Sequence, residues 1–159
     1  MERILELLEK NPRLTNAEIA IMLGITEAEV KNQITELENS GIIKGYRAII
    51  NKDKTDDQTV TALIEIQVHP KYDHGFEEIA ERISNFDEVE SVYLMSGGYD
   101  LCCLVNNKTF QEVAMFVAKR LSTLEDVIST KTNFILKRYK EQDVILFDSK
   151  QDDRGTISF

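Results

Sequence analysis

Apolar residues recur at helical spacing through residues 1–40 of the chain. Residues 1–10, MERILELLEK, have the pattern of a charged amphipathic helix. Two further helix starts are marked by a threonine with a glutamate three residues later, at Thr15 with Glu18 and at Thr26 with Glu29. This spacing is typical of a capping box, in which two side chains satisfy free backbone N–H groups at a helix start. The pattern therefore predicts two helices close together in the chain.

A tight turn is predicted between these two helices, because Gly24 can adopt the left-handed conformation that ends a helix. Leu14 can pack on Ile19 at the first helix start, and Ile25 on the second helix in the same way. The second helix has an apolar stripe formed by Val30, Ile34 and Leu37. Its opposite side is small and polar and consists of Ala28, Asn32, Thr35 and Asn39. This arrangement is a helix-turn-helix, although spacing alone leaves open a helical hairpin in another kind of domain.

The pattern changes after residues 51–59, a polar stretch that has the composition of a linker. The elements then follow as strand 60–68, helix 76–83, strand 89–95, strand 99–105, helix 110–121 and strand 127–136. This βαββαβ order is that of the ferredoxin-like fold, an antiparallel sheet with two helices on one face. The other face carries Leu63 beside the polar Thr61 and Glu65, and we expect a second copy to cover it.

Composition and charge restrict the class of function. The chain of 159 residues is 42% hydrophobic and 30% charged, which is typical of a globular protein. Its net charge of −9 is uneven, because residues 1–54 have a net charge of −1 and residues 55–159 a net charge of −8. Such a chain is not a general polyanion binder, since non-specific DNA affinity requires cations. The cations of the first part lie on or just after the second helix: Lys31, Lys44, Arg47, Lys52 and Lys54.

We interpret these cations as part of a nucleic-acid surface. The residues after the second helix are expected to form a strand pair, or wing, whose cations hold the DNA backbone. Asn32, Thr35 and Gln33 are then available to read base edges through hydrogen bonds. Few cations imply weak binding by one copy, which favours a dimer that contacts two half-sites.

Other chemistry has little support in the sequence. No apolar run approaches the ~20 residues of a membrane span, and no signal sequence begins the chain, so we expect a cytoplasmic protein. Cys102 and Cys103 are adjacent in the sequence and are predicted to be buried thiols in a strand. His69 and His74 flank Pro70 in a predicted loop without a third ligand. No catalytic constellation, phosphate-binding loop or cluster of metal ligands is seen, so neither an enzyme nor a cofactor is expected.

Several motifs resemble the Lrp/AsnC (feast/famine) family of transcription regulators. Leu23-Gly-Ile-Thr, Gly41-Ile-Ile and Gly45-Tyr46 are similar to its winged helix-turn-helix, and SGGYDL (96–101) and STKTNFIL (129–136) to its effector-binding domain. Gln33 departs from the basic residue that the family usually carries there. The resemblance implies double-stranded DNA as a partner and this DNA-binding set: Thr26, Ala28, Lys31, Asn32, Gln33, Thr35, Lys44, Arg47 and Lys52.

The glycine turn is the candidate site for a small molecule. Gly97 and Gly98 can expose N–H groups to a carboxylate, and Asp100 can accept an ammonium, a combination that suits an amino acid. Thr130 and Thr132 share one strand face and can add hydroxyl contacts. Turn chemistry alone also explains the glycines, and the resemblance favours a ligand. The predicted effector-binding set is Ser96, Gly97, Gly98, Tyr99, Asp100, Thr130 and Thr132.

The chain is thus predicted to be an α+β protein with four parts. Residues 1–50 form a winged helix-turn-helix, 51–59 a linker, 60–140 a ferredoxin-like effector-binding and oligomerisation domain, and 141–159 a C-terminal extension in which DVILFD can add an edge strand. We expect a DNA-binding regulator that responds to an amino-acid effector, as a homodimer that can assemble further. One alternative is an amino-acid sensor that acts through a protein partner; an enzyme has only fold analogy behind it.

Overall fold

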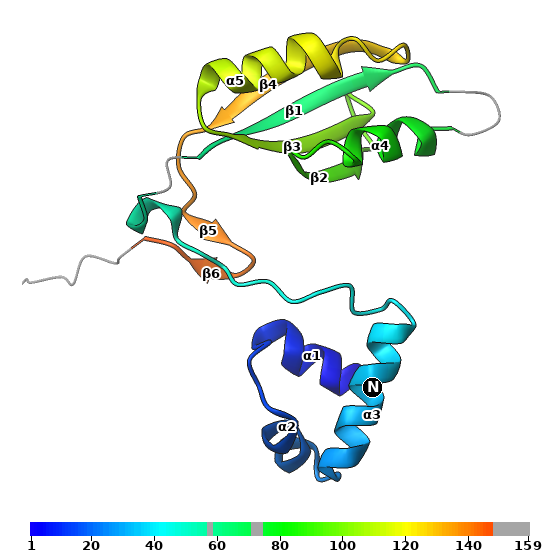
Figure 1. The fold of residues 1–159 in the computed structure, drawn as a ribbon, viewed down its shortest axis with the longest axis vertical. Helices are drawn as coiled ribbons and strands as arrows, with labels where there is room; N and C mark the ends of the chain where they lie inside the picture. Colours follow the sequence, from blue (N-terminus) through cyan, green and yellow to red (C-terminus); the bar gives the residue numbers. More distant parts are fainter. Residues whose placement is uncertain (57–58, 71–74, 148–159) are drawn as a thin grey trace, which may run out of the picture. The chain divides into compact units, whose positions relative to one another are not determined.

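The computed structural model describes residues 1–56, 59–70 and 75–147 (Figure 1). The chain divides into two compact units, Met1–Ile50 and Asn51–Phe159. Within the described ranges, no helix has the length and apolar character that a membrane span requires.

The first unit consists of three helices, α1 (Glu2–Lys10), α2 (Asn16–Leu23) and α3 (Glu27–Asn39). Both predicted capping boxes are confirmed. The Thr26 N–H donates to Oε2 of Glu29 over 2.8 Å, and the Glu29 N–H donates to Oγ1 of Thr26 over 3.2 Å. Gly24 ends α2 in the left-handed conformation, with φ 68° and ψ 33°, as predicted for the turn.

One small core holds the three helices together. Its buried residues are Ile4, Leu8, Ile19, Ala20, Val30 and Leu37. Leu14 and Ile25, the residues that precede the two threonine caps, are partly buried against this core, as their spacing predicts. Burial of the stripe on α3 leaves the opposite side of that helix exposed.

The wing predicted after α3 is not formed as a strand pair. Gly41 has a φ of 74° and turns the chain, after which the Ile43 N–H donates to the carbonyl oxygen of Leu37. Residues 44–50 are exposed and have no regular secondary structure. The next regular element is instead a 3₁₀ helix, η1 (Lys52–Lys54), because the Asn51 side chain accepts the Asp53 N–H and caps that turn.

The second unit confirms the βαββαβ order. Its elements are β1 (Val60–Val68), α4 (Glu77–Ser84), β2 (Val89–Leu94), β3 (Leu101–Asn107), α5 (Phe110–Phe116), the π-helical turn η2 (Val117–Leu121) and β4 (Val127–Ile135). The strands lie in the order β2-β3-β1-β4, and every neighbouring pair is antiparallel. β1 and β3 are therefore the central strands of the sheet (Figure 1).

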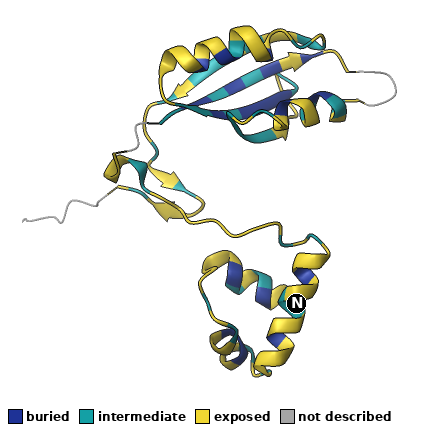
Figure 2. Cartoon of the chain, in the orientation of Figure 1, coloured by how far each residue is buried: buried dark blue, intermediate teal, exposed yellow. Residues whose placement is uncertain are grey.

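Both helices pack on the same face of this sheet. Ile79 and Ile83 of α4 and Val113 and Phe116 of α5 share one core with alternate residues of the strands. Figure 2 shows the buried residues concentrated on β1 and β3. Cys103 lies on this core face and is fully buried, whereas Cys102 points to the other face and is 4% exposed. The prediction of two buried strand thiols is confirmed.

The other face of the sheet is only partly apolar. Leu63 pairs with Leu104 across β1 and β3, and both are half-buried. Glu65 is half-buried, and Thr61 is buried with its hydroxyl donating to Oδ1 of Asn106 over 2.7 Å. This outer face combines an apolar pair with a hydrogen-bonded polar surface.

The C-terminal run DVILFD does not extend the main sheet, so that prediction was wrong. Val144–Ile145 (β6) pairs with Lys140–Glu141 (β5) in a separate two-stranded hairpin. Gln142 and Asp143 join the strands with φ angles of 42° and 67°, as a two-residue hairpin turn requires. β6 therefore pairs with β5, from which only two residues separate it, rather than with the edge of the main sheet. Residues 148–159 of the predicted extension lie outside the described residues.

Candidate nucleic-acid interface and effector site

The outer side of α3 presents a surface of small and polar side chains. Ala28, Asn32 and Thr35 are all exposed, and Lys31 lies beside them. Val30 and Leu37, on the opposite side, are buried at 0% and 1% exposure. The helix is thereby anchored by one stripe while a small polar face stays open, which is the geometry of a helix that enters a DNA groove.

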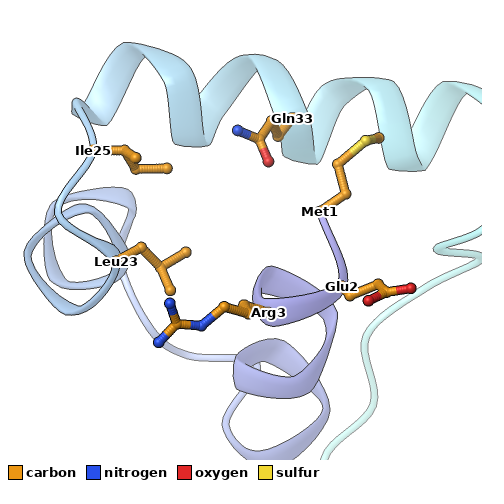
Figure 3. Close-up of a pocket in the computed structure, with 6 residues that line it drawn as sticks. All are labelled: Met1, Glu2, Arg3, Leu23, Ile25 and Gln33. Atoms are coloured by element: carbon orange, nitrogen blue, oxygen red, sulfur yellow. The ribbon is translucent and has the colours of Figure 1, made fainter.

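Gln33 does not share that face. Successive helical residues are rotated by about 100°, so Gln33 flanks the buried stripe and is half-buried. It points into a groove of about 510 Å³ lined by Met1, Glu2, Arg3, Leu23, Ile25 and Gln33 (Figure 3). The structure therefore does not bring Gln33 together with Asn32 and Thr35.

Two of the glutamates of α3 form hydrogen bonds within the first unit. The hydrogen bonds from the Thr26 backbone and side chain hold the pKa of the Glu29 carboxyl below its usual value. Glu38 accepts a hydrogen bond from the Tyr46 hydroxyl over 3.0 Å. These two carboxylates serve the fold of the helix-turn-helix, and the exposed face itself is flanked by Lys31 on one side and Glu36 on the other.

The predicted phosphate-binding cations fall in two units. Lys31 lies on α3, and Lys44 and Arg47 lie in the exposed segment that follows it. Lys52 belongs to η1 and thus to the second unit. The bond between Tyr46 and Glu38 ties the segment that carries Lys44 and Arg47 to the end of α3.

Asp100 fixes the glycine turn to the sheet. Its Oδ2 accepts the Val68 N–H over 2.9 Å, and its own N–H donates to the Ile66 carbonyl oxygen over 3.1 Å. The glycines are not needed for the shape of the turn. Neither Gly97 nor Gly98 has a positive φ, and a Cβ at either position would meet nothing within 4 Å. One carboxylate oxygen of Asp100 is thus already used by the backbone.

Within one chain, the two predicted threonines lie away from the turn. Thr130 pairs with Ile66 and Thr132 with Ile64, so both point to the helix-covered face. The Thr130 hydroxyl lies 3.3 Å from that of Ser122, which follows η2. The sequence-based set is therefore split between two faces of the sheet.

The turn instead borders a small cavity on the outer face. The cavity has a volume of about 180 Å³ and is lined by Glu65, Gln67, Gly98, Tyr99, Ser129 and Lys131. The Gln67 side chain donates to the Gly98 carbonyl oxygen and accepts the Ser129 hydroxyl. Lys131 Nζ lies 3.5 Å from Oε2 of Glu65, so an ammonium and a carboxylate meet at the cavity wall.

Four of these lining residues were missed from the sequence: Glu65, Gln67, Ser129 and Lys131. The alternation of β4 indicated only which face of the sheet each of its residues lies on. Thr130 and Thr132 have the same parity as the apolar Phe134, which marks the core face of β4, and Ser129 and Lys131 have the opposite parity. Among the described residues, no group of His, Cys, Asp and Glu side chains is arranged to hold a metal ion. His74 lies outside the described ranges.

Comparisons with known proteins agree with both halves of this structure. Residues 2–44 match a family model described as winged helix-turn-helix DNA-binding, and residues 61–145 match the Lrp/AsnC ligand binding domain. The chain is 48% identical over 155 residues to the uncharacterized HTH-type transcriptional regulator YugG of Bacillus subtilis, covering 97% of this chain and 93% of that protein. It is 31% identical over 137 residues to the HTH-type transcriptional regulator LrpA of Pyrococcus abyssi, covering 86% and 94%.

Solved structures share the fold. Escherichia coli AsnC superposes with a TM-score of 0.66 at 22% identity, covering 87% of this chain and 91% of that one. The regulator NMB0573 of Neisseria meningitidis, solved as a complex with L-Met, has a TM-score of 0.69 at 24% identity and covers 87% and 88%.

A winged helix-turn-helix joined to a ligand-binding domain defines a class of transcription regulators. The chain belongs to the Lrp/AsnC family within that class, so the resemblance first seen in its motifs is confirmed. The family consists of regulators rather than enzymes.

Proposed function

We propose that the chain is a sequence-specific DNA-binding transcription regulator whose assembly or DNA affinity responds to an amino-acid effector. The observation that carries the DNA-binding half is the exposed face of Ala28, Asn32 and Thr35, opposite the buried stripe of α3. Names of relatives such as LrpA, an HTH-type transcriptional regulator, support the same role.

Each part of the interface has a separate task in this proposal. Asn32 and Thr35 bind base edges, because amide and hydroxyl groups supply both donors and acceptors in the major groove. Ala28 leaves room for close approach, and Thr26 lies at the N-terminal end of α3, where N–H groups favour phosphate. Lys31, Lys44, Arg47 and Lys52 hold the backbone without reading sequence.

A mobility shift on the DNA upstream of the protein's own gene tests the base contacts. The double variant Asn32→Ala/Thr35→Ala should lose about thirtyfold or more in specific affinity, since each of the two base contacts contributes about 1–3 kcal/mol. Gln33→Ala is the matched control on the same helix and should bind within about twofold of the parent, because Gln33 flanks the core. Equal binding by the double variant and the parent would contradict the proposal.

Phosphate contacts give a different signature in the same assay. Arg47→Ala should weaken specific and unrelated DNA alike and should lower the salt slope by about one. If Arg47→Ala changed only the specific complex, Arg47 would read bases instead.

The effector half of the proposal concerns the glycine turn. An α-amino acid has an ammonium and a carboxylate a few ångströms apart, and Glu65 and Lys131 offer the complementary pair at the cavity beside Gly98. Thr130 and Thr132 lie on the other face, and reach the same ligand only if a second subunit presents them. The Neisseria relative in complex with L-Met supports an amino acid as the class of ligand.

We further propose that the chain acts in the cytoplasm as a homodimer that can close into larger assemblies. The half-buried pair Leu63 and Leu104 on the helix-free face of the sheet supports packing against a second copy. A ligand at such an interface stabilises one arrangement of subunits by its difference in affinity for the two arrangements. Light scattering that showed only monomers at micromolar concentration would contradict this assembly.

A further inference from the structure

Gln67 connects β1 to both β4 and the glycine turn at the outer cavity. Ser129 is its cross-strand partner on β4, and Oε1 of Gln67 accepts the Ser129 hydroxyl over 2.8 Å. Nε2 of Gln67 donates to the carbonyl oxygen of Gly98 over 3.2 Å. Because a carbonyl oxygen can only accept, this second bond fixes which end of the amide faces the turn. The amide is therefore held in one orientation, although Gln67 is an exposed residue.

These two bonds use only half of the hydrogen-bonding capacity of the amide. A glutamine side chain has two N–H donors and two acceptor sites on its oxygen. Within the part of the chain that the structure describes, one donor is bonded to Gly98 and one acceptor site to Ser129, which leaves one of each. Gln67 lines the cavity, so the remaining donor and acceptor border the space that a ligand would occupy. A ligand hydroxyl can pair with either or both, whereas an aliphatic group would cover them and leave them without partners.

The side chain of a bound amino acid would lie beside Gln67. Glu65 and Lys131 form one cross-strand pair, and Gln67 and Ser129 form the next pair on the same face, about 7 Å further along the strands. Both pairs line the cavity. An amino acid whose ammonium and carboxylate bind at the first pair therefore places its side chain at the second pair when it lies within the cavity.

The volume of the cavity limits the size of that side chain. The cavity measures about 180 Å³, whereas pockets for drug-sized ligands measure about 300 Å³ or more. A cavity of roughly 150 Å³ holds benzene, a molecule of about six non-hydrogen atoms. The space therefore suits a small amino acid such as L-alanine or L-serine.

We propose that Gln67 is a specificity-determining residue of the effector site, and that it selects a small amino acid with a neutral, hydrogen-bonding side chain. An acidic side chain offers only acceptors and a basic one only donors, so either would leave one site of the amide without a partner. A hydroxyl both donates and accepts, so L-serine is the model ligand. This inference rests on the proposed function and adds to it the chemical class of the effector's side chain.

Calorimetry with the full chain tests this selection by comparing L-serine with L-alanine, which lacks only the hydroxyl. The parent should bind L-serine about tenfold more tightly, because the hydroxyl adds hydrogen bonds to Gln67. Gln67→Met keeps an unbranched side chain of similar length but removes the amide, so the affinity ratio should fall to about one. Gln111→Met is the matched control, because it makes the same substitution at an exposed position of α5, and it should keep the parental ratio.

The ratio of the two affinities distinguishes selection from support of the fold. The two bonds between Asp100 and β1 remain in Gln67→Met and hold the turn, and any general weakening of the site lowers both affinities alike. A parental ratio in Gln67→Met, or equal affinity of the parent for L-serine and L-alanine, would overturn the proposal. Loss of both ligands in Gln67→Met would also overturn it, since selection among side chains leaves the contacts of Glu65 and Lys131 in place.

The size limit and the proposed function have separate outcomes in the same experiment. L-phenylalanine should bind the parent at least about tenfold more weakly than L-alanine, because its ring exceeds the cavity. Equal binding of these two amino acids would refute the size limit. If none of the twenty amino acids bound the parent, the proposed response to an effector would itself be contradicted, and the selection by Gln67 with it.

Discussion

The Tyr46 hydroxyl donates a hydrogen bond to Oε1 of Glu38 over 3.0 Å. A phenol is protonated at neutral pH, and burial, followed by the neighbouring Glu38 carboxylate, raises the pKa of Tyr46 further, so the hydroxyl remains the donor. The bond joins the last turn of α3 to the segment that carries Arg47, and it does so although no wing strand is formed.

Tyr46→Phe should weaken DNA binding without unfolding the first unit. Loss of one hydrogen bond of about 1 kcal/mol frees the segment around Arg47, so affinity should fall about three- to fivefold. Fluorescence anisotropy with labelled DNA measures the change. Tyr93→Phe removes an exposed hydroxyl in β2 and serves as the control. Equal losses in the two variants would mean that the Tyr46 bond has no part in binding.

Acid should destabilise the helix-turn-helix through its two caps. Hydrogen bonds from Thr15 and Thr26 lower the pKa of Glu18 and Glu29 below 4.5. Because the folded pKa is the lower one, ionised caps stabilise the fold fully above the unfolded value, and this contribution is lost as the pH falls through the folded value. Glu18→Gln/Glu29→Gln should therefore flatten the decline of the melting temperature below about pH 4.5. Parallel pH profiles for variant and parent would refute this source of acid sensitivity.

The two cysteines should be unreactive in the folded chain. Burial, and to a lesser extent Cys102, raise the pKa of Cys103 to about 12, and burial also raises the pKa of Cys102. The thiolate is the reactive form, so neither residue should be modified by a thiol reagent at neutral pH until denaturant is added. Rapid modification of either thiol under native conditions would show that the strand β3 opens.

The position of the effector can be tested by comparing variants on the two faces of β4. Lys131→Met removes the cation of the outer cavity, whereas Thr130→Val and Thr132→Val change the helix-covered side of β4. Calorimetry against the twenty amino acids should show that Lys131→Met weakens the best ligand about tenfold or more. If only the threonine variants lose binding, the ligand contacts the opposite face of β4, and the outer cavity has no role in binding.

The parts of the fold that could be predicted from the sequence depend on interactions within a few residues. A capping box needs only Thr26 and Glu29, and a left-handed turn needs only Gly24, so both are visible before any tertiary contact is known. The βαββαβ order could be read in the same way, from changes of period.

The parts that failed depend on which distant residue acts as partner. Val144–Ile145 had two possible pairing partners, the edge of the main sheet and β5. It pairs with β5, which is nearer in the sequence and closes the shorter loop. The threonine pair, Thr130 and Thr132, lies opposite Ile66 and Ile64, so within one chain it is on the helix-covered face, and whether a second subunit brings it to the ligand is not written in the strand pattern. The cavity at Gly98 needed the register of β1 against β4, which no single strand pattern contains.

The central claim is that an amino acid alters DNA binding by this chain, and one titration tests it most directly. The full chain is titrated against the DNA upstream of its own gene, with and without a mixture of the twenty amino acids at constant salt. The account predicts specific binding whose apparent affinity shifts by at least about fivefold in the mixture, as coupling between two sites requires. Identical binding curves with and without amino acids, or no specific binding in either, would contradict it.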